Sequence, residues 1–168
     1  MKHTRPTPVR AAWSGPLGAM TLAATPQGLC GVWFDGQRHE PDTSAWPRDD
    51  RHPLLRAAMD QLAAYFDGRR LAFELPLDLG TGTVFQQRVW QALLGIAAGQ
   101  TTSYGALSAA IGQPAAVRAL GAAVGRNPLS IVVPCHRVLG SDGSLTGYAG
   151  GLHRKTALLA LEQRAVHP

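Results

Sequence analysis

The sequence predicts an α+β protein, in which a small antiparallel sheet with one helix precedes a mainly helical half that contains a helix-turn-helix. Short apolar runs separated by Gly and Pro turn residues fill the beginning of the chain. From residue 84 onward, apolar residues recur at helical spacing. A Gly- and Thr-rich linker lies between these parts. We therefore place a boundary near residues 78–84, with a first domain over residues 1–80 and a second over residues 81–168.

The first domain is predicted to be a three-stranded meander with one helix. Gly-Pro and Pro-Gln-Gly turns separate its expected strands, over residues 9–14, 17–24 and 28–34. A polar, Pro-rich loop follows, and then an amphipathic helix is predicted over residues 54–66. The apolar residues of this helix recur at Leu55, Met59, Leu62 and Phe66. Residues 71–77 are expected to be extended.

The second domain is predicted to be mainly helical. Its helices are expected over residues 84–97, 103–111, 115–124 and 154–163. Ser103 is a suitable N-cap, and the break at Gly112-Gln113-Pro114 makes the flanking helices a helix-turn-helix candidate. Such pairs also occur in helical domains that do not bind DNA. Residues 130–133 are expected to form a short buried strand or extended run.

The composition is compatible with a cytoplasmic protein that binds a polyanion. The 168 residues carry a net charge of +5, but nearly all the positive charge is Arg, which GC-rich coding also produces. No apolar run follows the basic start, and none is long enough to span a membrane, so we expect neither a secretory signal nor membrane association. Cys30 and Cys135 are therefore expected to be free thiols in a reducing compartment.

Cys135 and His136 are the residues best suited to nucleophilic chemistry. Only a thiolate attacks well, and an imidazole within hydrogen-bond reach, directly or through a water, can take the thiol proton. Neighbours in sequence point to opposite sides of a strand, so the pair can cooperate only where the chain turns. Pro134 and the Gly-rich residues 139–151 favour such a turn. For the bare dipeptide, a structural Cys beside a chance His is the alternative.

Two further residues could support this pair. Glu162 lies in the apolar helical stretch ALLALE, where a buried carboxylate needs a partner and could hold the His tautomer. A solvated Glu near a helix end is equally compatible. Asn127 could bond backbone groups around the Cys turn, or simply end the preceding helix. The isolated Cys and scattered His residues have no metal-ligand spacing, and no phosphate or dinucleotide motif is present, so we expect no metal and no cofactor.

The segment IVVPCHRV closely resembles the O6-alkylguanine-DNA alkyltransferases, also called methylated-DNA–protein-cysteine methyltransferases. The resemblance continues, in the family's order, through FQQRVWQAL, TTSYGALSAAIG, AVRALGAAVGRNP, IVVPCHRVLGSDGSLTGYAGG and RKTALLALE. It covers residues 84–163. It implies a ribonuclease-H-like first domain and a second domain that binds DNA and accepts an alkyl group.

The resemblance implies catalytic roles for five residues. Cys135 would accept the alkyl group in an in-line displacement, while His136, through a water, and Glu162 would form the relay that makes the thiolate. Asn127 would brace the Cys turn. Tyr104 would crowd the phosphate beside the target nucleotide and donate a proton to the departing guanine.

The resemblance also implies that DNA is bound through its minor groove. Guanine O6 is buried inside the duplex, so the damaged base must be flipped out. Arg118 would enter the base stack in its place, and small residues such as Ala119 would allow close approach of the helix. The further DNA contacts implied are Tyr104, Gly105, Gln113 and Ser141.

Four residues would line the pocket for the base and its alkyl group: Val138, Tyr148, Ala149 and Gly150. Some relatives carry Ser at the position of Ala149, so a hydroxyl contact to guanine would be replaced by a backbone contact. Lys155 stands where the family often has a Lys that contacts the active-site loop. A plain surface Lys is the alternative at that position.

The implied function is direct-reversal repair of double-stranded DNA that contains O6-alkylguanine. A monomer would act once, without a cofactor, because the thioether formed on Cys135 is inert. Repair of O4-alkylthymine, the size range of the alkyl groups and cooperative assembly on DNA stay open. Two alternatives are a lesion sensor that leaves Cys135 unchanged and a cysteine hydrolase that turns over.

Overall fold

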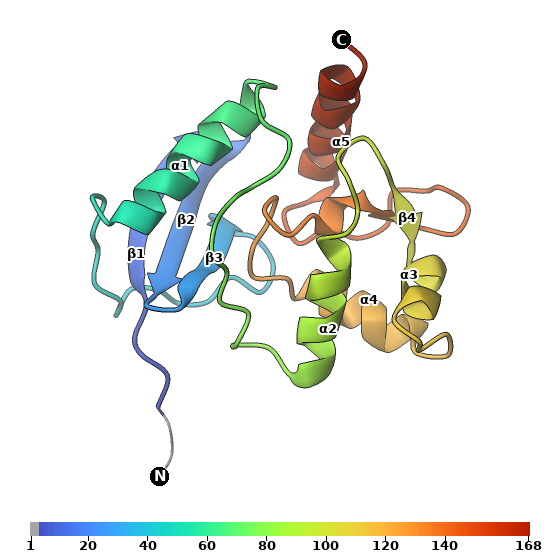
Figure 1. Cartoon of the computed structure of the whole chain (residues 1–168), viewed down its shortest axis with the longest axis horizontal. Coiled ribbons are helices and arrows are strands. Elements are labelled where there is room, and N and C mark those ends of the chain that lie inside the picture. Colours follow the sequence, from blue (N-terminus) through green and yellow to red (C-terminus); the bar gives the residue numbers. More distant parts are fainter. Residues whose placement is uncertain (1–3) are drawn as a thin grey trace.

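The computed structural model describes residues 4–168 and has the predicted α+β architecture. A three-stranded antiparallel sheet with one helix lies at one side of the molecule, and the remaining helices gather at the other (Figure 1). The first three residues of the predicted first domain lie outside the described residues.

The sheet has the strand order β1 (Val9–Gly15), β2 (Gly18–Thr25) and β3 (Gly28–Phe34), as the turn signals predict. Helix α1 (Pro53–Phe66) starts with Pro at its first position, where the missing N–H costs no hydrogen bond. The helix packs across the sheet (Figure 1).

The buried face of α1 differs slightly from the predicted one. Its buried side chains are those of Leu55, Ala58, Leu62 and Tyr65. Met59 and Phe66 are only partly buried, and the Phe66 ring stacks on Trp13 of β1. The rotation of this face brings Tyr65, rather than its neighbour, into the core.

The chain after α1 returns along the edge of the sheet. Leu77 pairs with Leu29 of β3 in parallel, so the end of the segment predicted to be extended runs beside that strand. The Asp78 carboxylate then accepts hydrogen bonds from Arg5 and Thr25. These bonds fix the chain on the sheet just before the helical half begins.

The helical half consists of α2 (Val84–Leu93), α3 (Tyr104–Ala110), α4 (Val117–Gly125) and α5 (Leu152–Val166). Thr83 and Gln86 form a capping box at the start of α2, and Ser103 caps α3 as predicted, accepting the Ala106 N–H at 3.0 Å. A six-residue connection with Gly112 at φ +76° joins α3 to α4. This pair is the predicted helix-turn-helix.

Helix α2 ends four residues before the predicted end at residue 97. The chain turns at Gly95, and the carbonyl of Ile96 accepts a hydrogen bond from the Arg137 guanidinium instead of an intrahelical N–H. The turn leads toward a two-stranded parallel sheet that sequence patterns did not reveal, formed by β4 (Thr102–Ser103) and β5 (Val138–Leu139).

The expectation of a short strand or extended run over residues 130–133 is wrong, because these residues form turns, although they are buried as expected. Only Leu129 pairs with the sheet, through Val32, and the chain then forms tight turns. Ile131 has φ +72°, which is unfavourable for a β-branched residue, so tertiary contacts outweigh its strand propensity.

One continuous core joins the two halves of the protein. It contains buried side chains of the sheet and α1 together with those of α2, α4, α5 and the segment around Cys135. Across residues 4–168, no helix is long and apolar enough to cross a membrane.

Candidate active site

Cys135 lies on a single turn of 3₁₀ helix, Cys135–Arg137, behind the connection that follows α4. The Asn127 side chain holds this connection: its Oδ1 accepts the Leu129 N–H at 2.9 Å, and its Nδ2 donates to the Val133 carbonyl at 2.7 Å. Asn127 is itself buried. It therefore ties the end of α4 to the residue two positions before the thiol.

His136 and Glu162 form a buried pair. His136 Nε2 lies 2.6 Å from Glu162 Oε1, and both side chains are excluded from solvent. An ionised carboxylate can only accept, so the Nε2 atom carries the proton and Nδ1 keeps its lone pair. Nδ1 is buried and has no partner among the described residues. The pair therefore leaves a free basic nitrogen on His136, the residue that follows Cys135 in the chain.

The surroundings of Glu162 keep it ionised. Burial tends to raise its pKa, but hydrogen bonds from His136 and Arg137 outweigh that effect and lower the pKa from 4.5 to about 2. Arg137 donates from Nε to Oε2 at 3.0 Å and from Nη2 to Oε1 at 2.7 Å. Tyr65 adds a third donor to Oε1, at 2.7 Å. A solvated Glu at this position is excluded.

Sequence reasoning missed Arg137 and Tyr65. A signal for Arg137 was present, because an Arg inside the apolar run around the Cys turn needs a buried partner. Tyr65 had no comparable signal. It belongs to the apolar face of α1, and 97 positions separate it from Glu162.

Lys155 lies below the loop that follows the Cys turn. Its Nζ donates to the carbonyls of Val138, Thr146 and Gly147, at 2.7, 2.8 and 3.3 Å, and the side chain is fully buried. The surface position considered for this Lys is thus excluded. The lysine fixes both ends of the loop at one point.

The thiol of Cys135 is protonated at rest. Burial raises its pKa, while the Asn127 side chain and the positive charge of Lys155 act in the opposite direction. Burial also lowers the pKa of His136, against the effect of Glu162. A neutral thiol beside a neutral imidazole is therefore the resting state, and forming the thiolate requires proton transfer.

A cavity of about 360 Å³ opens over Cys135, which is 7% exposed. Tyr104 and Gly121 line it on the side of α3 and α4, and Tyr148 and Ala149 line it on the side of the loop. The volume is in the range of pockets that hold small organic ligands. The thiol therefore faces a space that can take a molecule the size of a nucleobase.

Two of the four predicted pocket residues do not line this cavity. Val138 is fully buried behind the Cys turn, where its carbonyl accepts from Lys155. Gly150 lies under Tyr148, and a Cβ there would be 2.8 Å from the Tyr148 ring and 2.9 Å from Phe34. Both residues therefore shape the pocket from behind.

Arg38 and His39 line the cavity as well, and sequence reasoning missed them. They lie in the irregular segment after β3, where the Arg38 N–H donates to the Ala149 carbonyl at 3.0 Å. His39 has φ +63°, an uncommon backbone conformation for a residue other than Gly. No periodic pattern in this segment indicates where it docks.

The residues predicted to contact DNA lie at the surface. Gly105, Gln113, Arg118 and Ala119 are exposed on α3, α4 and their connection. Tyr104 is partly buried, and its hydroxyl lies 3.5 Å from the Thr146 carbonyl. Ser141 is exposed on the loop after β5. A Cβ added to Gly105 would meet no atom within 4 Å, so protein packing does not require Gly there.

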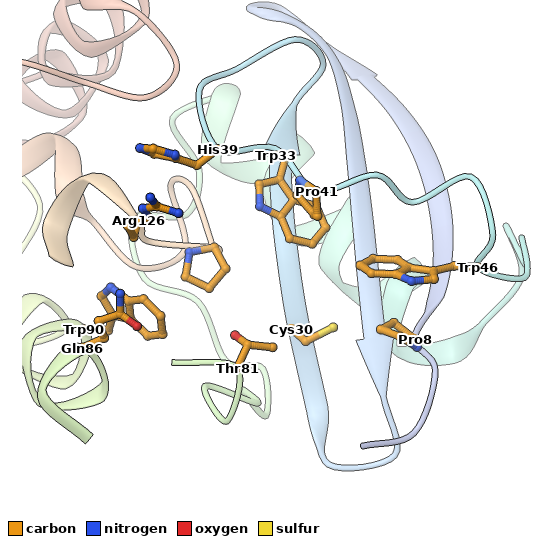
Figure 2. A pocket seen from close by; sticks show the side chains of 11 residues that line it. Pro8, Cys30, Trp33, His39, Pro41, Trp46, Thr81, Gln86, Trp90 and Arg126 are labelled. Atoms are coloured by element: carbon orange, nitrogen blue, oxygen red, sulfur yellow. The ribbon is translucent and has the colours of Figure 1, made fainter. Parts of the chain in front are cut away.

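A second cavity, of about 340 Å³, is lined by Cys30 (Figure 2). His39 lines both this cavity and the first one. Trp33, Trp46 and Trp90 surround it, and the Arg126 guanidinium lies near His39 at one end (Figure 2). Burial, followed by the charge of Asp78, raises the pKa of Cys30 to about 11. Cys30 packs as a small apolar residue, as predicted.

Both cysteines are free thiols. Within the described residues 4–168, no group of three or more His, Cys, Asp and Glu side chains is arranged to hold a metal ion.

Known families match both halves of the chain. Residues 11–79 match the model of the 6-O-methylguanine DNA methyltransferase ribonuclease-like domain. Residues 84–164 match that of the 6-O-methylguanine DNA methyltransferase DNA binding domain.

Individual relatives match over nearly the whole chain. A methylated-DNA–protein-cysteine methyltransferase of Mycolicibacterium paratuberculosis is 48% identical over 89% of this chain and 88% of its own. One from Methanosarcina acetivorans is 43% identical over 90% of this chain and 96% of its own. The crystal structure of Mycobacterium tuberculosis OGT in complex with DNA superimposes with a TM-score of 0.87, at 45% identity, over 94% of each chain. The chain therefore belongs to the 6-O-methylguanine DNA methyltransferase family.

Proposed function

We propose that this protein repairs O6-alkylguanine in double-stranded DNA by transferring the alkyl group to its own Cys135. The observation that carries the proposal is a cysteine that lines a cavity and is followed in the chain by His136, which is paired with the buried Glu162 carboxylate. Family membership and the likeness to a relative crystallised with DNA support the same reaction.

The first step is removal of the thiol proton. His136 Nδ1, whose lone pair is free, takes it through a bridging water, and Glu162 stabilises the imidazolium that results. The ion pair with Arg137 stabilises the ionised form of Glu162, so the carboxylate does not take the proton. The proton therefore stays on the imidazole. Lys155 and Asn127 stabilise the thiolate.

The second step is an in-line displacement at the alkyl carbon. The thiolate forms the S–C bond while the C–O6 bond breaks, and the electron pair of the C–O6 bond leaves with guanine. Tyr104, at the rim of the cavity, supplies a proton to the departing base. The thioether left on Cys135 has no leaving tendency, so each molecule acts once and needs no cofactor.

The substrate enters as a flipped base. O6 of guanine is inaccessible within the stack, and flipping costs a few kcal/mol, less for a poorly paired base. Arg118 on α4 occupies the gap from the minor groove, while Ala119 and Gly105 let the backbone approach the DNA. Gln113 and Ser141 provide further contacts at the surface.

Tyr148 and Ala149 hold the flipped base, with Val138 and Gly150 shaping the pocket from behind. The two domains thereby have different roles. The first, residues 1–80, supports the relay, and the second, residues 81–168, binds DNA and accepts the alkyl group. The two free thiols and the chemistry on chromosomal DNA fit a reducing cytoplasm.

A stoichiometric repair assay tests this function. Increasing protein is mixed with a duplex that carries one O6-methylguanine, and the remaining lesion is measured by its resistance to a restriction enzyme. We expect one lesion removed per protein molecule and no further repair when fresh duplex is added. Repair that continues past one equivalent, or lesion-selective binding without repair, would overturn the proposal.

A further inference from the structure

One hydrogen bond connects the first domain directly to the proposed relay. The Tyr65 hydroxyl, at the end of α1, donates to Glu162 Oε1 at 2.7 Å. Tyr65 is fully buried, and its ring packs against Phe66 and Phe73 at centroid distances of 5.4 and 5.6 Å. These ring contacts hold the hydroxyl in place, so it stays aimed at Glu162.

The other groups that face Glu162 come from the Cys turn. His136 Nε2 and Arg137 Nη2 share Oε1 with Tyr65, whereas Arg137 Nε donates to Oε2. Lys155, the other buried cation nearby, bonds to carbonyls of the loop and not to Glu162. Three donors thus share one carboxylate oxygen, and Tyr65 is the one that comes from the first domain.

Tyr65 is a neutral donor throughout the working pH range. Burial and the neighbouring Glu162 charge raise the pKa of its hydroxyl far above the ordinary value. The hydroxyl therefore always presents a proton to Oε1. Each donor on that oxygen reduces the charge that remains for the His136 N–H.

We propose that Tyr65 is a positioning residue of the alkyl-transfer relay, through which the first domain orients Glu162 and limits its pull on His136. The expected effect on the transfer rate rests on the proposed function. The expected effect on the His136 imidazole does not. Tyr65 touches neither Cys135 nor the cavity above it. It acts only through Glu162.

The variant Tyr65→Phe isolates this effect, because it removes the donor and keeps the ring that packs on α1. With one donor fewer, Glu162 bonds more strongly to the His136 N–H and stabilises the imidazolium more. The Nε2 proton resonance of His136 should then move downfield. The acid limb of the transfer rate should move to higher pH, by about half a unit or more.

Leu62→Val is the matched control. Leu62 is buried on the same face of α1, and its aliphatic side chain cannot donate a hydrogen bond to Glu162. A purely structural loss in this helix would lower the unfolding temperature and leave both the resonance and the acid limb in place. Thermal unfolding of all three proteins establishes that they are folded before they are compared.

Two measurements on 15N-His-labelled protein decide the question: the Nε2–H chemical shift, and the pH profile of single-turnover transfer to Cys135. We expect both to move in Tyr65→Phe and neither to move in Leu62→Val. A resonance at the wild-type position, or an unchanged acid limb, would overturn the inference. If the wild-type protein transfers no alkyl group, the proposed function fails and the resonance alone decides the role of Tyr65.

Discussion

The guanidinium of Arg137 holds both carboxylate oxygens of Glu162, with Nη2 2.7 Å from Oε1 and Nε 3.0 Å from Oε2. This two-point contact is buried, and it fixes the orientation in which Glu162 meets His136. The residue next to the proposed base, His136, therefore also fixes the geometry of the proposed relay.

Replacing Arg137 by Ala should strongly destabilise the protein. The change leaves the Glu162 carboxylate buried with half of its donors, which typically costs about 3–5 kcal/mol. The free energy of unfolding in urea measures this loss. Arg69→Ala, which breaks an exposed ion pair with Asp67, is the control and should have little effect. Equal losses in the two variants would contradict the assigned role of Arg137.

Stability should fall with acid in two steps. His136 is buried with a lowered pKa, so the unfolded chain binds its proton first, and stability is lost as the pH falls below 6.5. Glu162 has a pKa of about 2 instead of 4.5, so its contribution, on the order of 3 kcal/mol, is lost as the pH falls from 4.5 to 2. Urea unfolding measured from pH 8 to pH 3 follows the first step and the beginning of the second. A Glu162→Gln variant that keeps the wild-type acid dependence below pH 4.5 would contradict this assignment.

Lys155→Met should shift the pH dependence of alkyl transfer to higher pH. The change removes the positive charge that holds down the pKa of Cys135, and it leaves three loop carbonyls without their donor. Single-turnover rates across pH measure the effect. His153→Ala, at an exposed position of the same helix, should keep the wild-type profile. If Lys155→Met and His153→Ala give the same profile, the charge of Lys155 does not act on the thiol.

Arg118→Ala should slow repair of duplex DNA while leaving the repair of single strands nearly unchanged. In a single strand no base has to be flipped out of a duplex stack, so a residue that supports flipping should contribute little to the repair rate there. We expect roughly a tenfold or greater loss on the duplex, from the few kcal/mol that flipping costs. Arg164→Ala, an exposed Arg on α5, controls for the loss of one positive charge. A uniform loss on both substrates would instead indicate a simple phosphate contact.

Helices and strands were predictable where the sequence signal that marks them is local. Turn residues delimit β1, β2 and β3, and the Ser103 cap marks the start of α3. The strand or extended run expected at residues 130–133 is absent because Asn127 and the surrounding core impose turns on residues that otherwise favour strands. Strand propensity there is real, but long-range contacts override it.

The residues of the candidate site were likewise predictable only where a local motif marks them. Cys135 and His136 are adjacent and stand in a distinctive motif, so the sequence reveals them, and the apolar helix around Glu162 raises the possibility of a buried carboxylate. Tyr65 and Arg38 reach the site only through the packing of the first domain on the second. No spacing within the chain indicates that packing.

The most direct test of the central claim is mass spectrometry of the protein after reaction with a duplex that carries one O6-methylguanine. We predict one methyl group per protein, located on the Cys135 peptide, with the Cys30 peptide unmodified. Cys135→Ser should gain no methyl group, whereas Cys30→Ser should react like the wild-type protein. An unmodified Cys135 together with tight, lesion-selective binding would contradict the account and leave a damage sensor in its place.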